Sequence, residues 1–427
     1  MKQPNETVKN RALLAGVHLN EDTDFEASMK ELKNLVKACD MDPVTRIDQN
    51  LSCVNAAYYI GSGKVSEIRE AAEALSIDCV VFNDTLSPSQ LKNLQRDIDV
   101  PVWDRTYLIL EIFSRRARTK EAKMQVESAR LQYMLPRLMG LRASLGRQGG
   151  ASGSLSNKGS GEKQIELDRR KIEGRISELG HELERMEQER EVQRRKRSRG
   201  LYPQAALVGY TNAGKSTLMN CLVKQYTGKE EKMVMAKDML FATLDTTVRK
   251  ISPGGNLDFL LSDTVGFISR LPHGLVKAFR STLNEVRYAD LLLHVVDCSD
   301  EHYKEQMEVT EETLAELGVG DIPRIYIMNK ADSVMDEADL PKIADDRIYM
   351  SAKFGTGIPE LLQMMNRILF SEYQEAQFLI PYENGNLIHY FNSHALVHSR
   401  EYLDDGVRLK VSCHSSDREK YGEYLII

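Results

Sequence analysis

One nine-residue run combines glycine, lysine and hydroxyl residues at a spacing that can hold phosphate groups. The run GYTNAGKST begins at Gly209, matches G-x-x-x-x-G-K-[ST], and lies between a strand-like run, AALV, and a helix-like run, STLMNCLVKQY. Glycines let backbone N–H groups approach phosphates, Lys215 can reach the outer phosphates, and the hydroxyl of Ser216 is a suitable Mg²⁺ ligand. The run predicts a loop that binds a nucleoside triphosphate through Gly209, Tyr210, Thr211, Asn212, Ala213, Gly214, Lys215, Ser216 and Thr217.

A second motif indicates which base is bound. The apolar run RIYIM leads into NKAD at Asn329, where the carboxylate of Asp332 can accept hydrogen bonds from both N1–H and the exocyclic N2 amine of guanine. Adenine has no donor at that edge and would leave a buried carboxylate unpaired, so guanine is preferred. The run SAK, again after a strand-like run, fits a loop that closes over the base. The predicted base-binding residues are Asn329, Lys330, Ala331, Asp332, Ser351, Ala352 and Lys353.

Two segments between these motifs carry residues that can sense the third phosphate. LSDTVGF places Asp263 where it can hold the Mg²⁺ shell and Gly266 where its N–H can meet the γ-phosphate. MLFATLDTTVR offers Thr243 as a second Mg²⁺ hydroxyl, with Thr246 and Thr247 as alternatives. Hydrolysis would release both segments, as in the GTPase switch, so the order of motifs predicts GTP and Mg²⁺ binding. The predicted metal ligands are Ser216, Thr243 and Asp263, and the further nucleotide contacts are Phe241, Ala242, Leu244, Asp245, Thr264, Val265 and Gly266.

The residues expected to act in hydrolysis are Lys215, Asn212 and Gly266. Many GTPases have a water-orienting Gln after the glycine, whereas this chain has Phe267, whose side chain neither donates nor accepts a hydrogen bond. This substitution predicts slow intrinsic turnover, unless another polar group of the switch loop takes the role. The side-chain oxygen of Asn212 could hold a monovalent cation beside the phosphates, so K⁺ activation is a further hypothesis.

The chain has 427 residues, which suggests two to four domains, and the motifs require an α/β fold to position them. Over 1–105, the apolar runs RALLAGVHL, IDCVVFN and VPVWD alternate with the helical patterns FEASMKELKNLVKAC, IREAAEALS and SPSQLKNLQRDI, which predicts an N-terminal parallel-sheet α/β domain. We expect a long antiparallel helical hairpin over 106–200, a P-loop GTPase domain over 201–371 and a small α+β domain over 372–427. YIGSGKVSEI in the first domain resembles part of a phosphate loop, but a tight turn that opens a helix is the favoured interpretation.

The hairpin is predicted from two apolar stripes. Met124, Leu131 and Leu135 recur at helical spacing. A second helical pattern runs from Glu162 to about Arg199 and carries a heptad-like seam from Ile165 to Met186. Neither stripe can be buried alone, so the two helices should pack together, with a glycine-rich tip at 145–161. The stretch from Arg137 to Lys163 has one acidic residue, Glu162, and five basic ones, although the whole chain has a net charge of −6: Arg137, Arg142, Arg147, Lys158 and Lys163. A local excess of this kind favours RNA contact over a plain connector. The predicted RNA-binding residues are Arg142, Arg147, Lys158 and Lys163.

Composition excludes several other classes of protein. Hydrophobic residues make up 42% of the chain, but no apolar run approaches the roughly 18–20 residues that cross a bilayer, and the first residues lack a signal-peptide core. We therefore expect a cytoplasmic protein without integral membrane association. The six cysteines are scattered without a C-x-x-C pair, which argues against a disulfide framework and against a zinc site.

Several of these runs together resemble the HflX family of ribosome-associated GTPases. The likeness covers about residues 10 to 370 and rests on YIGSGKVSEI, VVFNDTLSPSQLKNL, the run from Trp103 to Leu138, GYTNAGKSTLMN, LFATLD, DTVGFISRLPH and FRSTLNEV. The resemblance implies a monomeric protein that binds the large ribosomal subunit in its GTP form, through ribosomal RNA and ribosomal protein, and splits or rescues stalled ribosomes. It also implies secondary ATP hydrolysis. The chain departs from the family pattern with LDTT in place of LDPT and with GGASGSLSNKGSGEKQIEL at the hairpin tip.

Two other classes of function compete with the ribosome hypothesis. A GTPase switch that docks a protein partner through the hairpin would show no dependence on RNA. A P-loop kinase or metabolic ATPase is disfavoured by NKAD and by the lack of a recognisable motif for an acceptor substrate.

Overall fold

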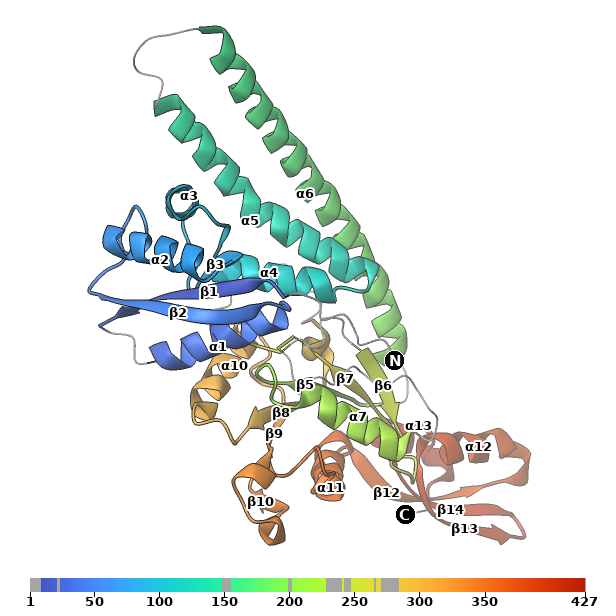
Figure 1. Cartoon of the computed structure of the whole chain (residues 1–427). Helices are drawn as coiled ribbons and strands as arrows, with labels where there is room; N and C mark the ends of the chain where they lie inside the picture. The colour runs from blue at the N-terminus through green and yellow to red at the C-terminus, as the bar shows by residue number, and fades with distance from the viewer. Residues whose placement is uncertain are drawn as a thin grey trace, which may run out of the picture. The chain divides into compact units, whose positions relative to one another are not determined.

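The computed structural model describes residues 9–20, 24–147, 155–198, 202–227, 240–241, 247–264, 266–269 and 284–426. Within helices, the side chains of 139–147, 155–165 and 190–198 lie outside the description. The chain divides into two compact units, which are described separately (Figure 1). One comprises Met1–Glu189, Asp238–Asp245 and Ser269–Arg280, and the other comprises Arg190–Lys237, Thr246–Ile268 and Ser281–Ile427.

The first unit begins with a four-stranded, entirely parallel sheet in the order β2-β1-β3-β4. This confirms the predicted parallel-sheet α/β domain. Its core is built from Leu13 and Val80 on the strands and from Ile68 and Leu94 on the helices, all buried. The strands are β1 (Arg11–Leu19), β2 (Asp42–Leu51), β3 (Cys79–Phe82) and β4 (Val102–Trp103), and the helices are α1 (Phe25–Ala38), α2 (Ser62–Ala74), α3 (Pro88–Ile98) and α4 (Arg105–Arg116).

Local signals explain where some of these helices start. Ser87 accepts a hydrogen bond from the Gln90 backbone, and the Gln90 side chain accepts one from the Ser87 backbone, a capping box that fixes the first turn of α3. The Gly61 N–H donates to Gln49 Oε1 at 2.8 Å, and α2 starts at the next residue. The phosphate-loop-like run is therefore a turn that opens a helix.

Two long helices, α5 (Lys120–Arg147) and α6 (Leu155–Ser198), lie side by side in this unit (Figure 1). Arg175 forms an ion pair with Glu127 at 2.8 Å, and Glu182 forms one with Lys120 at 3.3 Å. From Arg175 to Glu182 the chain runs forward along α6, while their partners run backward along α5, from Glu127 to Lys120. The helices are therefore antiparallel, as predicted. Leu179 of the predicted seam is buried. Both helices extend into the stretch 145–161 that we expected to form the tip, and 148–154 lies outside the described residues.

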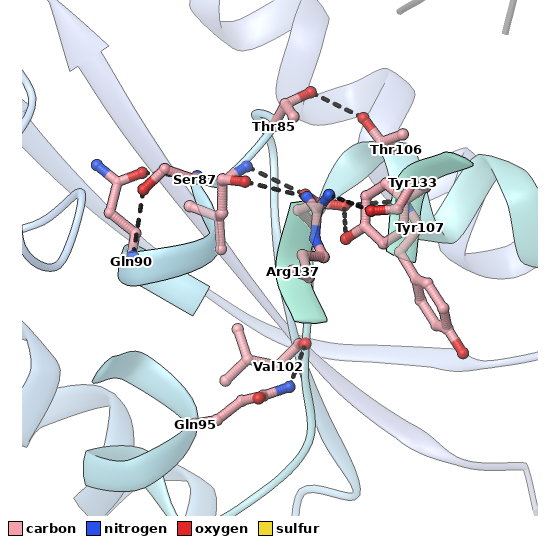
Figure 2. Close-up of polar contacts among 11 residues, drawn as sticks. Thr85, Ser87, Gln90, Gln95, Val102, Thr106, Tyr107, Tyr133 and Arg137 are labelled. Atoms are coloured by element: carbon pink, nitrogen blue, oxygen red, sulfur yellow. Dashed lines mark hydrogen bonds and ion pairs between the residues drawn. The ribbon is translucent and has the colours of Figure 1, made fainter. Parts of the chain in front are cut away.

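A buried carboxylate joins α5 to the parallel-sheet domain. Asp104 is 0% exposed and accepts hydrogen bonds from the backbone N–H groups of Tyr107 and Leu86. It also accepts hydrogen bonds from the Tyr133 hydroxyl and from Arg137, both at 2.9 Å (Figure 2). The Arg137 guanidinium also lies over the Tyr133 ring, 3.3 Å from its centroid. Burial raises the pKa of Asp104, but four donors, one of them the Arg137 cation, compensate for its desolvation. Arg137 is therefore a structural residue, and the basic excess near the tip rests on the other basic side chains.

The second unit contains a seven-stranded sheet in the order β10-β11-β9-β8-β5-β7-β6. Its central strands are parallel, whereas the β6–β7 and β10–β11 pairs are antiparallel. The strands are β5 (Gln204–Val208), β6 (Thr247–Ile251), β7 (Phe259–Asp263), β8 (Leu291–Asp297), β9 (Arg324–Asn329), β10 (Lys342–Ala344) and β11 (Arg347–Tyr349). The helices are α7 (Lys215–Tyr226), α10 (Tyr303–Glu316) and α11 (Ile358–Leu369).

A small α+β domain completes this unit, as expected from the sequence. Its three-stranded antiparallel sheet has the order β12-β14-β13, and Phe391 of the first helix stacks on Phe378 of the sheet. The elements are β12 (Tyr373–Ile380), α12 (Gly385–His394), β13 (Leu396–Leu403), β14 (Gly406–His414) and α13 (Ser415–Lys420).

All six thiols are free, and three of them are buried. Among the helices in the described part of the chain, none has the combined length and apolar character that a membrane span requires.

Candidate functional site: a phosphate loop beside a base-binding loop

The phosphate loop connects the carboxyl end of β5 to the first turn of α7. Asn212 and Gly214 have left-handed backbone angles, with φ of +63° and +99°. A Cβ at Gly214 would lie 2.1 Å from Nδ2 of Asn329, so only glycine fits this position. The loop turns sharply into α7, which starts at Lys215 and directs its first backbone N–H groups at the loop. The loop thus has the backbone geometry that the predicted binding of phosphate requires, and its role in binding stays a prediction.

The side chain of Lys215 folds back from the start of α7 onto this loop. Its ammonium donates to the carbonyls of Gly209 at 2.8 Å and Tyr210 at 2.7 Å, and its side chain is buried. Burial lowers the pKa of Lys215 to about 8, while the charge of Asp263 acts in the opposite direction. Phosphate oxygens near the ammonium would favour its charged form and raise this pKa.

Ser216 and Asp263 form the core of the expected metal site. The Ser216 hydroxyl donates to Oδ2 of Asp263 at 2.9 Å, and Asp263 is fully buried at the carboxyl end of β7. A hydroxyl and a carboxylate from these two elements are the oxygen donors that Mg²⁺ prefers, so the residues present fit the ion. Thr243, the third expected ligand, lies outside the described residues.

The segment after β7 is bound to the phosphate loop through its backbone. The Thr211 N–H donates to the Phe267 carbonyl at 2.8 Å, and the Phe267 N–H donates to the Gly209 carbonyl at 3.2 Å. A Cβ at Gly266 would lie 2.9 Å from Nζ of Lys215, so the backbone approaches the lysine where a side chain could not. The Phe267 side chain is buried, which keeps it from orienting a water molecule.

The loop that the sequence predicts to bind the base is assembled around Asn329 at the carboxyl end of β9. Its Nδ2 donates to the Ala213 carbonyl at 2.8 Å, and its Oδ1 accepts from the Ala352 N–H at 2.9 Å. The Ala331 N–H donates to the Met350 carbonyl at 3.2 Å. One buried side chain thus joins the phosphate loop to both loops that the sequence assigned to the base.

Two buried hydroxyls remain available at this site. Apart from Thr247 Oγ1 at the start of β6, the hydroxyls in the described part of the chain that are buried without a hydrogen-bond partner are Thr211 Oγ1 and Ser351 Oγ. Buried polar atoms are normally paired, so these two fit a site that receives a polar ligand. One hydroxyl belongs to the phosphate loop and the other to the base-closing loop, which suits a nucleotide spanning both.

Other predicted residues have different surroundings. The Thr264 hydroxyl donates to the Leu207 carbonyl at 2.6 Å, which is a contact within the sheet. Phe241 belongs to the first unit, where its ring packs edge-on against Phe113, at 4.6 Å between centroids. Ala242, Thr243, Leu244, Asp245 and Val265 lie outside the described residues, as do the side chains of Arg142, Arg147, Lys158 and Lys163.

The loop after β8 also contacts this site, and it was not predicted from the sequence. Asp297 forms an ion pair with Lys330 at 2.6 Å, and Cys298 donates to the Asn329 carbonyl. The signal was present as an apolar run ending in DCSD, but only the parallel pairing of β8 with β9 places it beside NKAD.

Three family models match consecutive parts of the chain. They are described as GTP-binding GTPase N-terminal over 26–114, GTP-binding GTPase Middle Region over 116–197 and 50S ribosome-binding GTPase over 204–330. A "GTPase HflX" of Lacrimispora saccharolytica is 41% identical over 401 residues, covering 94% of this chain and 92% of the relative. The chain belongs to the HflX family of GTPases.

A second relative supports the same assignment. The "GTPase HflX" of Caldanaerobacter subterraneus is 40% identical over 418 residues, which cover 98% of this chain and 94% of the relative. A solved GTP-binding protein from Sulfolobus solfataricus in complex with GDP is 26% identical, with a TM-score of 0.45 over 85% of this chain and 99% of that one. As an HflX-family member with a P-loop GTPase domain, the chain is a GTP-hydrolysing enzyme, and this family implies Mg²⁺ as the usual metal.

Proposed function

We propose that this HflX-family GTPase binds the large ribosomal subunit in its GTP form and uses GTP hydrolysis in splitting or rescuing stalled ribosomes. The observation that carries the proposal is the match of 204–330, which includes the phosphate loop and Asn329, to the family of 50S ribosome-binding GTPases. The protein acts as a monomer in this proposal.

The proposed nucleotide site uses the residues that the sequence predicts. Gly209 through Thr217 hold the phosphates, Ser216 and Asp263 with Thr243 hold Mg²⁺, and Asn329 with Asp332 recognise guanine. The two buried hydroxyls of Thr211 and Ser351 support a polar ligand that spans both loops. Lys215 and Gly266 stabilise charge on the γ-phosphate, since a buried ammonium and a backbone N–H interact strongly with developing negative charge.

Slow intrinsic hydrolysis is part of the proposal. Phe267 stands where a water-orienting side chain is common, and its ring is buried. A partner that reorders the switch segments would then control the rate. Asn212 is proposed to hold K⁺ beside the phosphates, which would supply positive charge without an arginine from a partner.

The helical hairpin is proposed to contact ribosomal RNA through the basic residues near its tip. Arg142 and Arg147 belong to the last turns of α5, while Lys158 and Lys163 belong to the first turns of α6. Their backbone positions therefore gather the four residues near one end of an antiparallel pair. Contacts to RNA phosphates at this end predict binding that weakens as salt increases.

Cosedimentation of the full chain with large ribosomal subunits tests the proposal, in a non-hydrolysable GTP analogue and in GDP. We expect binding with the analogue and much weaker binding with GDP. Replacement of Arg142, Arg147 and Lys158 by Ala should weaken the association and leave GTP affinity unchanged.

A matched control replaces Arg170 and Lys171, which are exposed on α6 further from the tip, and should leave association unchanged. Absence of binding in both nucleotide states would refute the ribosome role and leave the alternative of a protein-docking switch. Unchanged association of the tip variant would refute the RNA contact alone.

A further inference from the structure

Asp297, the last residue of β8, uses both oxygens of its carboxylate in the loop beside the base-binding motif. Oδ1 accepts hydrogen bonds from the backbone N–H of Ser299 at 3.1 Å and from its hydroxyl at 2.5 Å. Oδ2 accepts from the ammonium of Lys330 at 2.6 Å. The side chains of Asp297 and Lys330 are 16% and 34% exposed, so solvent screens this pair only in part.

The next residue binds the same motif through a second contact. The Asn329 carbonyl accepts hydrogen bonds from the Cys298 N–H at 3.1 Å and from the Cys298 thiol at 3.0 Å. The parallel register of β8 and β9 places Asp297 beside Asn329, which explains why both contacts form at this point. We call residues 297–299 the β8 brace.

Lys330 needs such support because of its backbone. It has a left-handed conformation, with φ of +60°, directly before Ala331 and Asp332. A residue with a Cβ is disfavoured there and persists when its surroundings hold it. The ion pair anchors the far end of the Lys330 side chain, and the Cys298 contacts hold the peptide before it. The brace therefore restrains both the side chain and the preceding peptide of Lys330, the residue whose backbone sets the direction of Asp332.

We propose that Asp297 is a positioning residue for guanine recognition, which acts by holding Lys330 so that the NKAD loop is ordered before the base arrives. The proposal rests on the assignment of Asn329 and Asp332 to the base, and it does not depend on ribosome binding. An ordered loop loses less conformational freedom on binding, so the brace contributes affinity through the base rather than through the phosphates.

The test uses the full chain and competition between a fluorescent GDP analogue and unlabelled GDP or ADP. Asp297→Asn keeps the shape and the acceptor for Ser299 but removes the ion pair. We expect the Kd for GDP to rise about fivefold, the effect of losing one partly screened ion pair, while the Kd for ADP stays unchanged. The KM for GTP should rise by the same factor, with kcat at saturating GTP unchanged.

Two further variants complete the test. Lys330→Met removes the same ion pair from the other side, so it should give the same loss, and the double variant should be no worse than either single one. Asp300→Asn is the matched control in the same loop, where Asp300 accepts from the His302 backbone at 2.9 Å, and it should bind like the wild type.

Different outcomes would overturn different parts of the proposal. Wild-type GDP affinity in Asp297→Asn, an equal loss for GDP and ADP, or additive losses in the double variant would each overturn the role of the brace. Asp332→Asn should abolish the preference for GDP over ADP. If it leaves the preference intact, the assignment of the base site is wrong and the proposal fails with it.

Discussion

Replacing Gly214 with alanine should damage both the phosphate loop and the base loop. Gly214 has φ of +99°, and a Cβ built there lies 2.1 Å from Nδ2 of Asn329. That nitrogen donates to the Ala213 carbonyl at 2.8 Å, so the new methyl group must displace either the loop or the asparagine. The addition of one methyl group therefore affects the phosphate loop and the base loop together.

The magnitude follows from these two effects. A Cβ in a left-handed conformation costs about 1–2 kcal/mol. Disrupting the hydrogen bond between Asn329 and Ala213 costs about 1 kcal/mol more. We expect the free energy of unfolding of the GTPase domain to fall by about 2–3 kcal/mol, and the Kd for GDP to rise by at least about tenfold.

Fluorescence titration with a GDP analogue and thermal unfolding measure these two quantities. Gly320→Ala is the matched control in the same unit, since a Cβ at Gly320 meets nothing within 4 Å and its φ is not left-handed. We expect this control to change stability by less than about 0.5 kcal/mol. If Gly214→Ala binds GDP within about twofold of the wild type and unfolds at the same temperature, the reasoning is refuted.

Three further predictions concern protons, cations and the hairpin. The pKa of Lys215 is about 8, and phosphate favours its charged form, so GDP affinity should be constant below that pH and fall roughly tenfold per unit above it; a flat titration to pH 9.5 would contradict this. GTP turnover should be faster in KCl than in NaCl at equal ionic strength, and equal rates would remove the proposed cation at Asn212. Arg137→Met should cost about 3 kcal/mol at neutral pH, because Asp104 stays buried and charged. Burial raises the pKa of Asp104. The cost of Arg137→Met, measured by urea unfolding, should therefore shrink as the pH falls and Asp104 becomes protonated. A cost that stays the same at every pH would contradict the assignment.

The chemistry of the nucleotide site was predictable because it depends on short, contiguous spacing. The phosphate loop, Asp263 and NKAD each lie within one strand-to-loop junction, so their local order fixes what they contact. The β8 brace could not be predicted in the same way. Asp297 and Lys330 are distant in sequence, and only the parallel register of β8 with β9 brings them within 2.6 Å.

The fold was predictable where the hydrophobic pattern was strong. The alternation of strands and helices in the first domain was confirmed, but β2 was missed, because DPVTRIDQNL is mostly polar and forms an edge strand. The helix α6 starts at Leu155, before the expected Glu162, despite Gly159 and Gly161. Glycine lowers helix propensity by about 1 kcal/mol, a preference that the rest of a 44-residue helix can override.

The role of Arg137 also could not be predicted from the sequence. The sequence places it among basic residues near the tip, whereas the structure binds it to Asp104 and to the face of Tyr133. A charge count cannot separate a cation that neutralises a buried carboxylate from one that faces solvent.

The rate of GTP hydrolysis with and without large ribosomal subunits tests the central claim most directly. We expect slow turnover by the isolated protein, because Phe267 cannot orient water, and a strong, saturable rise when large subunits are added. Small subunits should have no such effect. Fast hydrolysis by the isolated protein, or a rate that large subunits leave unchanged, would rule out a ribosome-activated GTPase.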